Sequence, residues 1–138
     1  MNAQNIAQRA RDGVLRHIAS GRLPDYSRTP PPATFAALTR LLVAGQSAGC
    51  NAREIVELAQ TIAIACHGQR HLWEDLGLAG RTEISTLLAH YFRPLRQRNV
   101  LDLRWKRFLF GKLGLQPPGC SQCDQSPVCF GAQATRQD

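Results

Sequence analysis

The stretch Asn51-Ala-Arg-Glu-Ile-Val-Glu-Leu-Ala-Gln-Thr-Ile-Ala-Ile-Ala-Cys-His-Gly68 decides the fold class of this chain. Asn51 is a favourable N-cap residue, and Glu54 follows three residues later, at the spacing of a capping box. The apolar face at helical spacing comprises Ile55, Ala59, Ile62 and Cys66. Gly68 ends the pattern, so the stretch predicts an amphipathic helix between Asn51 and Gly68.

The same periodicity recurs on both sides of this helix. Phe35, Leu38 and Leu42 predict a helix that Gly45 and Gly49 end. After a short helical turn or structured loop over residues 71–78, Thr82 is the expected cap of another helix. Its buried face would consist of Ile84, Leu87, Leu88 and Tyr91.

The last predicted helix starts at Asp102 and ends at Gly114. Its inward positions are Leu101, Trp105, Phe108, Leu109 and Leu113, and its outer side carries Arg104, Lys106, Arg107 and Lys112. Residues 1–20 predict a further helix with a thin apolar stripe, which a Pro-rich linker separates from the rest. No strand-like alternation of any length is visible. The expected fold is therefore all-α, a compact bundle of four to six short helices with an irregular C-terminal cysteine-rich metal-binding loop.

Size and composition exclude several classes of protein. The chain has 138 residues and is 43% apolar, which predicts one domain with a true core and argues against wholesale disorder. No stretch approaches the roughly 20 apolar residues of a membrane span, and the first residues lack the apolar core of a signal peptide. A cytoplasmic protein is the expectation.

The positive charge is concentrated in one part of the chain. The net charge of the chain is +7. The segment from Arg81 to Lys112 contains eight basic residues and only two acidic ones, Glu83 and Asp102, so its local net charge is +6. Such a stretch favours an anionic partner, which could be nucleic acid, an acidic protein surface or a small oxyanion. The candidates for oxyanion or partner binding are Arg104, Lys106 and Arg107.

Three of the five cysteines form the run Cys120-Ser-Gln-Cys123-Asp-Gln-Ser-Pro-Val-Cys129. This clustering is typical of a metal or cluster site, and prolines and glycine keep the segment from becoming helical. Structural zinc requires four protein ligands, whereas a three-iron cluster takes three thiolates. Possible additional ligands are Cys66, His67 and His71, although a buried core thiol is the simpler interpretation of Cys66.

The motifs of common enzymes do not occur in the chain. It has no Gly-rich phosphate loop, no GxSxG and no recognisable pair of catalytic carboxylates, so we expect no enzyme activity and no catalytic residue. One interpretation of the basic stretch beside a cysteine knuckle is a small zinc-stabilised nucleic-acid-binding module. The aromatic residues lie on the predicted buried faces of the helices, so we do not expect nucleic acid as a partner.

Three segments in order resemble the NifQ family of nitrogen-fixation proteins. They are Ala65-Cys-His-Gly-Gln-Arg-His-Leu-Trp-Glu-Asp-Leu-Gly-Leu78, Arg98-Asn99 with Leu103-Arg-Trp-Lys-Arg-Phe108, and Cys120 to Gly131. The resemblance runs from about Phe35 to Gly131 and implies a NifQ-like helical domain over 33–131. We expect the N-terminal helix and linker over 1–32 to be peripheral to it and residues 132–138 to form a disordered tail. The resemblance also implies a molybdenum carrier that binds an iron–sulfur cluster and supplies nitrogenase iron–molybdenum cofactor synthesis.

The partners that this resemblance implies are the nitrogenase cofactor scaffold and the nitrogenase reductase. The resemblance also implies that Cys120, Cys123 and Cys129 are the ligands of the cluster. The family usually has a further cysteine where this chain has Leu115, so a degenerate relative without molybdenum donor activity is an alternative. A three-iron cluster with three thiolates still leaves a corner of sulfides that can accept molybdenum, and basic side chains would attract molybdate.

Overall fold

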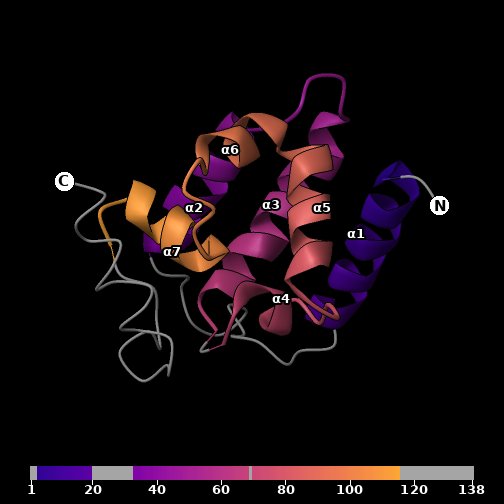
Figure 1. Cartoon of the computed structure of the whole chain (residues 1–138), viewed down its shortest axis with the longest axis horizontal. Helices are drawn as coiled ribbons and strands as arrows, with labels where there is room; N and C mark the ends of the chain where they lie inside the picture. The colour runs from indigo at the N-terminus through magenta and orange to yellow at the C-terminus, as the bar shows by residue number, and fades with distance from the viewer. Residues whose placement is uncertain (1–2, 20–32, 69, 116–138) are drawn as a thin grey trace.

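The computed structural model describes residues 3–19, 33–68 and 70–115, and these ranges are all-helical with no strand. Seven helices are present in them (Figure 1): α1 (Ala3–Ala19), α2 (Ala33–Ala44), α3 (Ala52–Cys66), α4 (Leu72–Asp75), α5 (Arg81–Tyr91), α6 (Arg93–Arg98) and α7 (Trp105–Lys112). The all-α prediction is confirmed for this part of the chain. The cysteine loop and the expected tail lie outside the described residues. None of the described helices is long and apolar enough to cross a membrane.

The helix predicted from Asn51 is α3, and it begins as its capping residue indicates. The Asn51 Oδ1 accepts hydrogen bonds from the backbone N–H groups of Arg53 and Glu54, at 2.9 and 3.1 Å. Two of the otherwise unpaired donors of the first turn are thereby satisfied. The predicted apolar face is buried, and α3 packs against α2. Each large apolar side chain buried in this way stabilises the fold by about 1.5–3 kcal/mol.

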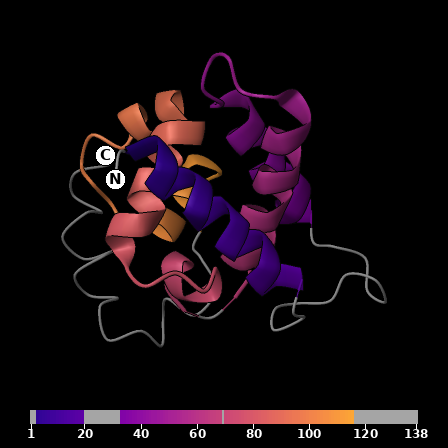
Figure 2. The ribbon, with the colours of Figure 1, turned by 90° about the vertical axis from the view of Figure 1, so that its right-hand side faces the viewer.

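The N-terminal helix α1 belongs to the core, contrary to the peripheral position expected for it. It packs lengthwise against α5 and also contacts α3 (Figures 1 and 2). The buried residues of α1 include Ala7, Ala10 and Val14, whereas Ile6 is exposed. Small side chains at this spacing allow the helices to approach closely, and a search for large apolar residues overlooks them.

The helix α6 is the element that the sequence reasoning did not include. It follows α5 directly, with Pro94 in its first turn, where the missing N–H costs no hydrogen bond. The link after α2 is fixed to this corner by Ser47, whose hydroxyl donates to the His90 carbonyl at 2.7 Å and accepts from the Arg93 N–H at 2.9 Å. At Gly45 a Cβ would lie 2.6 Å from the Leu95 Cβ, so this close approach requires glycine.

Two predicted helix starts are wrong. The helix α5 begins at Arg81 with Gly80 as its N-cap rather than at Thr82. The helix α7 begins at Trp105 with Arg104 as its N-cap, and Asp102 precedes it with a φ of 51°. The Arg81 side chain of α5 and the Asn99 side chain within the loop hold residues 99–103 in a non-helical conformation instead, so Leu101 is 39% exposed and does not face inward.

Candidate metal site and its basic surroundings

The predicted ligands Cys120, Cys123 and Cys129 lie outside the described residues, so the structure places only the region that leads to them. The helix α7 ends at Lys112, and Gly114 follows with a φ of 74°. The Leu115 N–H donates to the Phe110 carbonyl at 2.9 Å, which closes the helix in a Schellman-type turn. Leu115 is 45% exposed, so this position, five residues before Cys120, lies at the surface.

Cys66 is a core residue in this structure. Its side chain is fully buried, and burial raises the pKa of the Cys66 thiol to about 12. A metal ligand must be a thiolate, which this environment strongly disfavours. Cys66 is therefore poorly suited as an additional ligand, and the simpler interpretation of a buried thiol is confirmed. Cys50 is also a free thiol and is partly buried.

Both ring nitrogens of His67 are occupied by protein groups. The Nδ1–H donates to the Ala63 carbonyl at 2.7 Å, and the Nε2 accepts from the Thr34 hydroxyl at 2.7 Å. The ring also packs edge-on against Phe110, with 6.1 Å between centroids. Burial, opposed by the hydrogen bond to Ala63, lowers the pKa of His67, so its neutral form is favoured.

His71 lies at the N-cap of α4 and is partly buried. Its backbone N–H donates to the Glu74 carboxylate at 3.4 Å. Within residues 3–19, 33–68 and 70–115, no three His, Cys, Asp or Glu side chains are grouped so that they could hold a metal ion. Three thiols at the CxxCx5C spacing fit an iron–sulfur cluster by their donor chemistry, and the described part adds no preformed fourth ligand.

Lys106 and Arg107 are buried, at 6% and 7% exposure. The prediction that both side chains lie on the solvent-facing side of the last helix is therefore wrong. The Lys106 ammonium forms an ion pair with the Asp75 carboxylate and donates to the Gly68 carbonyl at 2.9 Å. The Asp75 carboxylate also accepts from the Arg70 N–H at 3.2 Å. A buried charge requires such partners, because its hydration is lost. Lys106 is thus committed to the interior, whereas Arg104 remains partly exposed.

We call the residues Gly68, Arg70, Asp75 and Lys106 the buried junction, since they join the end of α3 to α4 and α7. Gly68 is required there, because a Cβ would overlap the Asp75 carboxylate. The sequence predicted Lys106 on the outer side of the last helix and indicated no role for Asp75. No local signal in the sequence identifies the pair, because Asp75 follows another acid and Lys106 stands between Arg104 and Arg107.

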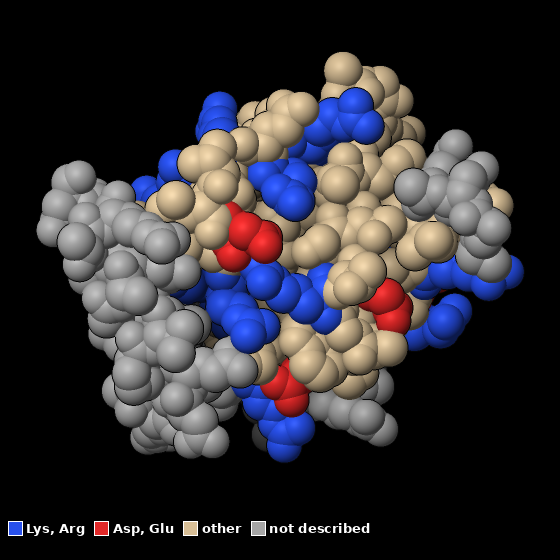
Figure 3. Space-filling view, viewed as in Figure 1, with Lys and Arg blue, Asp and Glu red and all other residues tan. Residues whose placement is uncertain are grey.

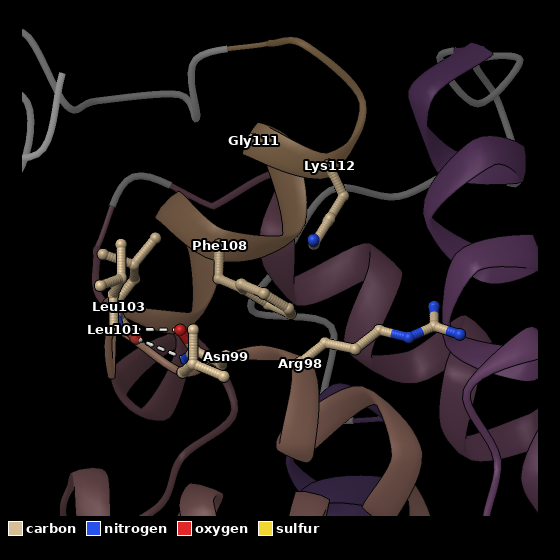
Figure 4. A pocket seen from close by; sticks show the side chains of 8 residues that line it. Arg98, Asn99, Leu101, Leu103, Phe108, Gly111 and Lys112 are labelled. Carbon is tan, nitrogen blue, oxygen red and sulfur yellow. Dashed lines mark hydrogen bonds between the residues drawn. The ribbon is translucent and has the colours of Figure 1, made fainter. Parts of the chain in front are cut away.

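The exposed cations of the basic stretch lie elsewhere. Arg98 and Lys112 are exposed and line an open cavity of about 340 Å³ beside the end of α7 (Figure 4). Figure 3 shows basic side chains gathered across the face that carries α6 and α7, with acidic side chains in the minority. This face therefore presents positive charge to an approaching anion.

The sequence model of the NifQ family matches residues 3–131, nearly the whole chain. Protein NifQ of Azotobacter vinelandii is 42% identical over 83 residues, which cover 55% of this chain and 43% of that protein. The protein NifQ homolog of Sinorhizobium fredii is 36% identical over 118 residues, 80% of this chain and 50% of the relative. Protein NifQ of Rhodobacter capsulatus is 34% identical over 90 residues, 60% of this chain and 50% of the relative.

This chain spans about half the length of the curated relatives that it matches. No solved structure matches it significantly. The family match begins in α1 and extends beyond the third cysteine of the CxxCx5C run, so it includes both the helical core and the predicted ligands. Because this match covers far more than half of the chain, the chain belongs to the NifQ family.

Proposed function

We propose that this protein is a carrier that binds an iron–sulfur cluster and molybdenum and supplies molybdenum for nitrogenase iron–molybdenum cofactor biosynthesis. The observation that carries the proposal is the family match over residues 3–131, which contains the three-thiol run. Membership of the NifQ family supports a role in nitrogen fixation. The role is that of a donor protein and not of a turnover enzyme.

The donor chemistry of the three cysteines supports this assignment. Cys120, Cys123 and Cys129 would hold a three-iron cluster as thiolates, one for each iron. Sulfides at the vacant corner of such a cluster are soft ligands suited to a further metal such as molybdenum. We expect molybdate to be attracted by the exposed cations Arg98 and Lys112 rather than by Lys106, which the buried junction uses.

The decisive experiment is anaerobic purification and reconstitution with iron and sulfide, followed by metal analysis and electron paramagnetic resonance. The expected result is the signal of an oxidised three-iron cluster, which should fade as molybdenum is incorporated. Stoichiometric zinc without iron uptake would contradict the proposal and favour a zinc-stabilised module.

Single serine substitutions identify the ligands. We expect Cys120→Ser, Cys123→Ser and Cys129→Ser each to abolish the cluster, because a three-iron cluster has no spare protein ligand. The matched control is Cys50→Ser, which removes a partly buried thiol and should leave the iron content unchanged. Full cluster retention in any of the first three variants would show that the ligand set is wrong.

A fourth thiol can be supplied at the surface. Leu115→Cys restores the usual family pattern at an exposed position five residues before Cys120. If the missing ligand limits the cluster type, this variant should bind a four-iron cluster, with the corresponding change in the resonance signal. An unchanged three-iron signal would show that residue 115 does not reach the cluster.

The partners that we propose are the nitrogenase cofactor scaffold and the nitrogenase reductase. The nucleic-acid alternative gains no support from the aromatic residues of α7, because base stacking requires exposed rings. Trp105 and Phe108 are buried, and the Trp105 indole N–H donates to the Ser85 hydroxyl at 3.2 Å.

A further inference from the structure

The cavity beside the end of α7 combines positive charge with apolar walls. Its volume is about 340 Å³, within the range of ligand-binding pockets. It is lined by Arg98, Asn99, Val100, Leu101, Leu103, Phe108, Gly111 and Lys112, among which no side chain is acidic. In Figure 4 the Phe108 ring lies between the side chains of Arg98 and Lys112, and the Lys112 Nζ is 5.3 Å from the ring centroid. Such a lining suits an occupant that is both negatively charged and partly apolar.

Exposed apolar side chains surround this cavity. Val100 is 83% exposed, Leu101 is 39% exposed, and Leu115, just beyond α7, is 45% exposed. Among the described residues, only two other large apolar side chains are comparably exposed, those of Ile6 and Val56. A cluster of this kind beside basic residues is typical of a surface that another chain segment covers.

The loop that presents Val100 and Leu101 is held rigidly. The Asn99 amide donates to the Leu103 carbonyl at 3.0 Å, and its Oδ1 accepts from the Leu103 N–H at 2.9 Å. The Arg81 guanidinium donates to the Asp102 and Leu103 carbonyls, both at 2.9 Å. A preorganised surface loses little conformational entropy when it is covered, so its contacts contribute more to docking.

We propose that this cavity is the docking surface for the C-terminal cysteine segment, residues 116–131, when its three thiols are thiolates on a metal cluster. The inference rests on the proposed function, because the cluster supplies the negative charge. Cluster thiolates are anionic, and Asp124 is the only charged side chain of the segment. Val128 and Phe130 flank Cys129 and offer apolar side chains to the walls of the cavity.

The point at which the described chain ends favours this occupant over others. The Schellman-type turn fixes the exit at Leu115, only three residues after Lys112 of the cavity lining. The five residues from there to Cys120 can span up to about 17 Å, enough to return over the cavity. A short tether of this kind gives an effective concentration in the millimolar range, so even a weak contact is occupied.

The lysines of the chain supply a direct test. Lys106 and Lys112 are the only two, and Lys106 is buried in its ion pair. The full chain is treated anaerobically with an acetylating reagent, before and after iron–sulfide loading. Peptide mass spectrometry then measures the rate of acetylation at each lysine. With an intrinsic dissociation constant of about 0.1 mM and an effective concentration of about 1 mM, loading should slow Lys112 acetylation about tenfold.

A pair of variants locates the protection. Val100→Asp places a negative charge on the exposed loop and should restore fast Lys112 acetylation at unchanged iron content. The matched control Val56→Asp makes the same change at another exposed valine, on α3, and should keep the protection. Lys106 serves as the internal reference in every sample.

Each outcome decides between the proposals. Absence of iron uptake contradicts the proposed function and the docking with it. Iron uptake without Lys112 protection, or protection that survives Val100→Asp, overturns the docking alone. Protection that increases with protein concentration would assign the surface to a second copy of the chain and would also overturn it.

Discussion

The basic stretch of this protein separates into two regions with opposite uses of charge. In the buried junction, Lys106 is surrounded by protein groups and neutralises Asp75. At the cavity beside α7, Arg98 and Lys112 are exposed and no acidic side chain is in the lining. These cations all lie within fifteen residues of the chain. The difference shows that local net charge in a sequence does not measure the charge that a surface presents.

The two regions therefore answer differently to the loss of a cation. A buried ion pair that loses one partner leaves an uncompensated charge, whereas an exposed cation is replaced by water at little cost. The junction should thus control stability, and the cavity should control anion attraction and docking.

The largest expected effect is that of removing the buried cation. Lys106→Met should lower the free energy of unfolding by about 3–5 kcal/mol, since the Asp75 carboxylate loses its buried counter-ion. Urea unfolding measures the change. The matched control Lys112→Met should cost less than about 0.5 kcal/mol, because that side chain is exposed. Equal losses in the two variants would remove the distinction between the regions.

A methyl group added to the junction should have the next largest effect. Gly68→Ala places a Cβ against the Asp75 carboxylate and should destabilise the fold by about 1–3 kcal/mol through overpacking. Thermal or urea unfolding measures the change. In α1, Gly13→Ala has open space around the new Cβ and should be stabilising by about 0.5–1 kcal/mol. A neutral Gly68→Ala would mean that Asp75 can move without loss.

The clamp of the cavity loop can be released by one substitution. Asn99→Ala removes two hydrogen bonds to Leu103 and should cost about 1–2 kcal/mol of stability. If the preorganised loop contributes to docking, the same variant should also reduce the protection of Lys112 in the loaded chain. Unchanged protection would show that the loop need not be rigid.

The smallest expected effect is a pH dependence of the unfolding free energy that His67, next to Gly68 of the buried junction, would cause. Burial, with Lys106 as a further contributor, lowers the pKa of His67 below its ordinary value of 6.5. The unfolded chain therefore binds the proton more readily, so the unfolding free energy should fall as the pH decreases through about 6.5. Urea unfolding between about pH 8 and pH 5.5 measures this slope, which His67→Gln should reduce. An identical slope in the variant would assign it to other groups.

Periodicity predicted the parts of the fold where apolar residues decide the outcome. The helix α3 was predicted with its cap and its buried face, because Asn51 acts locally and the apolar spacing is regular. The start of α7 was not, because Arg81 of α5 holds the preceding loop through the Asp102 and Leu103 carbonyls, 21 and 22 residues away. Local propensity cannot reveal such distant hydrogen bonds.

The candidate site was predictable to a different extent. The chemistry of the three cysteines follows from their spacing, and their assignment stays a prediction. The sequence predicted that Lys106 binds an oxyanion. In the structure it pairs instead with Asp75, which lies 31 residues away along the chain. Pairing of two buried charges depends on tertiary packing, and the charged neighbours Glu74 and Arg107 make each residue resemble an ordinary surface charge in the sequence.

The packing of α1 on α5 has a consequence for any shortened form of this protein. Residues 33–115 alone would expose the apolar surface that Ala7, Ala10 and Val14 now cover. Uncovered helix faces of this kind promote self-association during folding. A minimal soluble fragment must therefore retain the N-terminal helix, even though it lies far along the chain from the thiols.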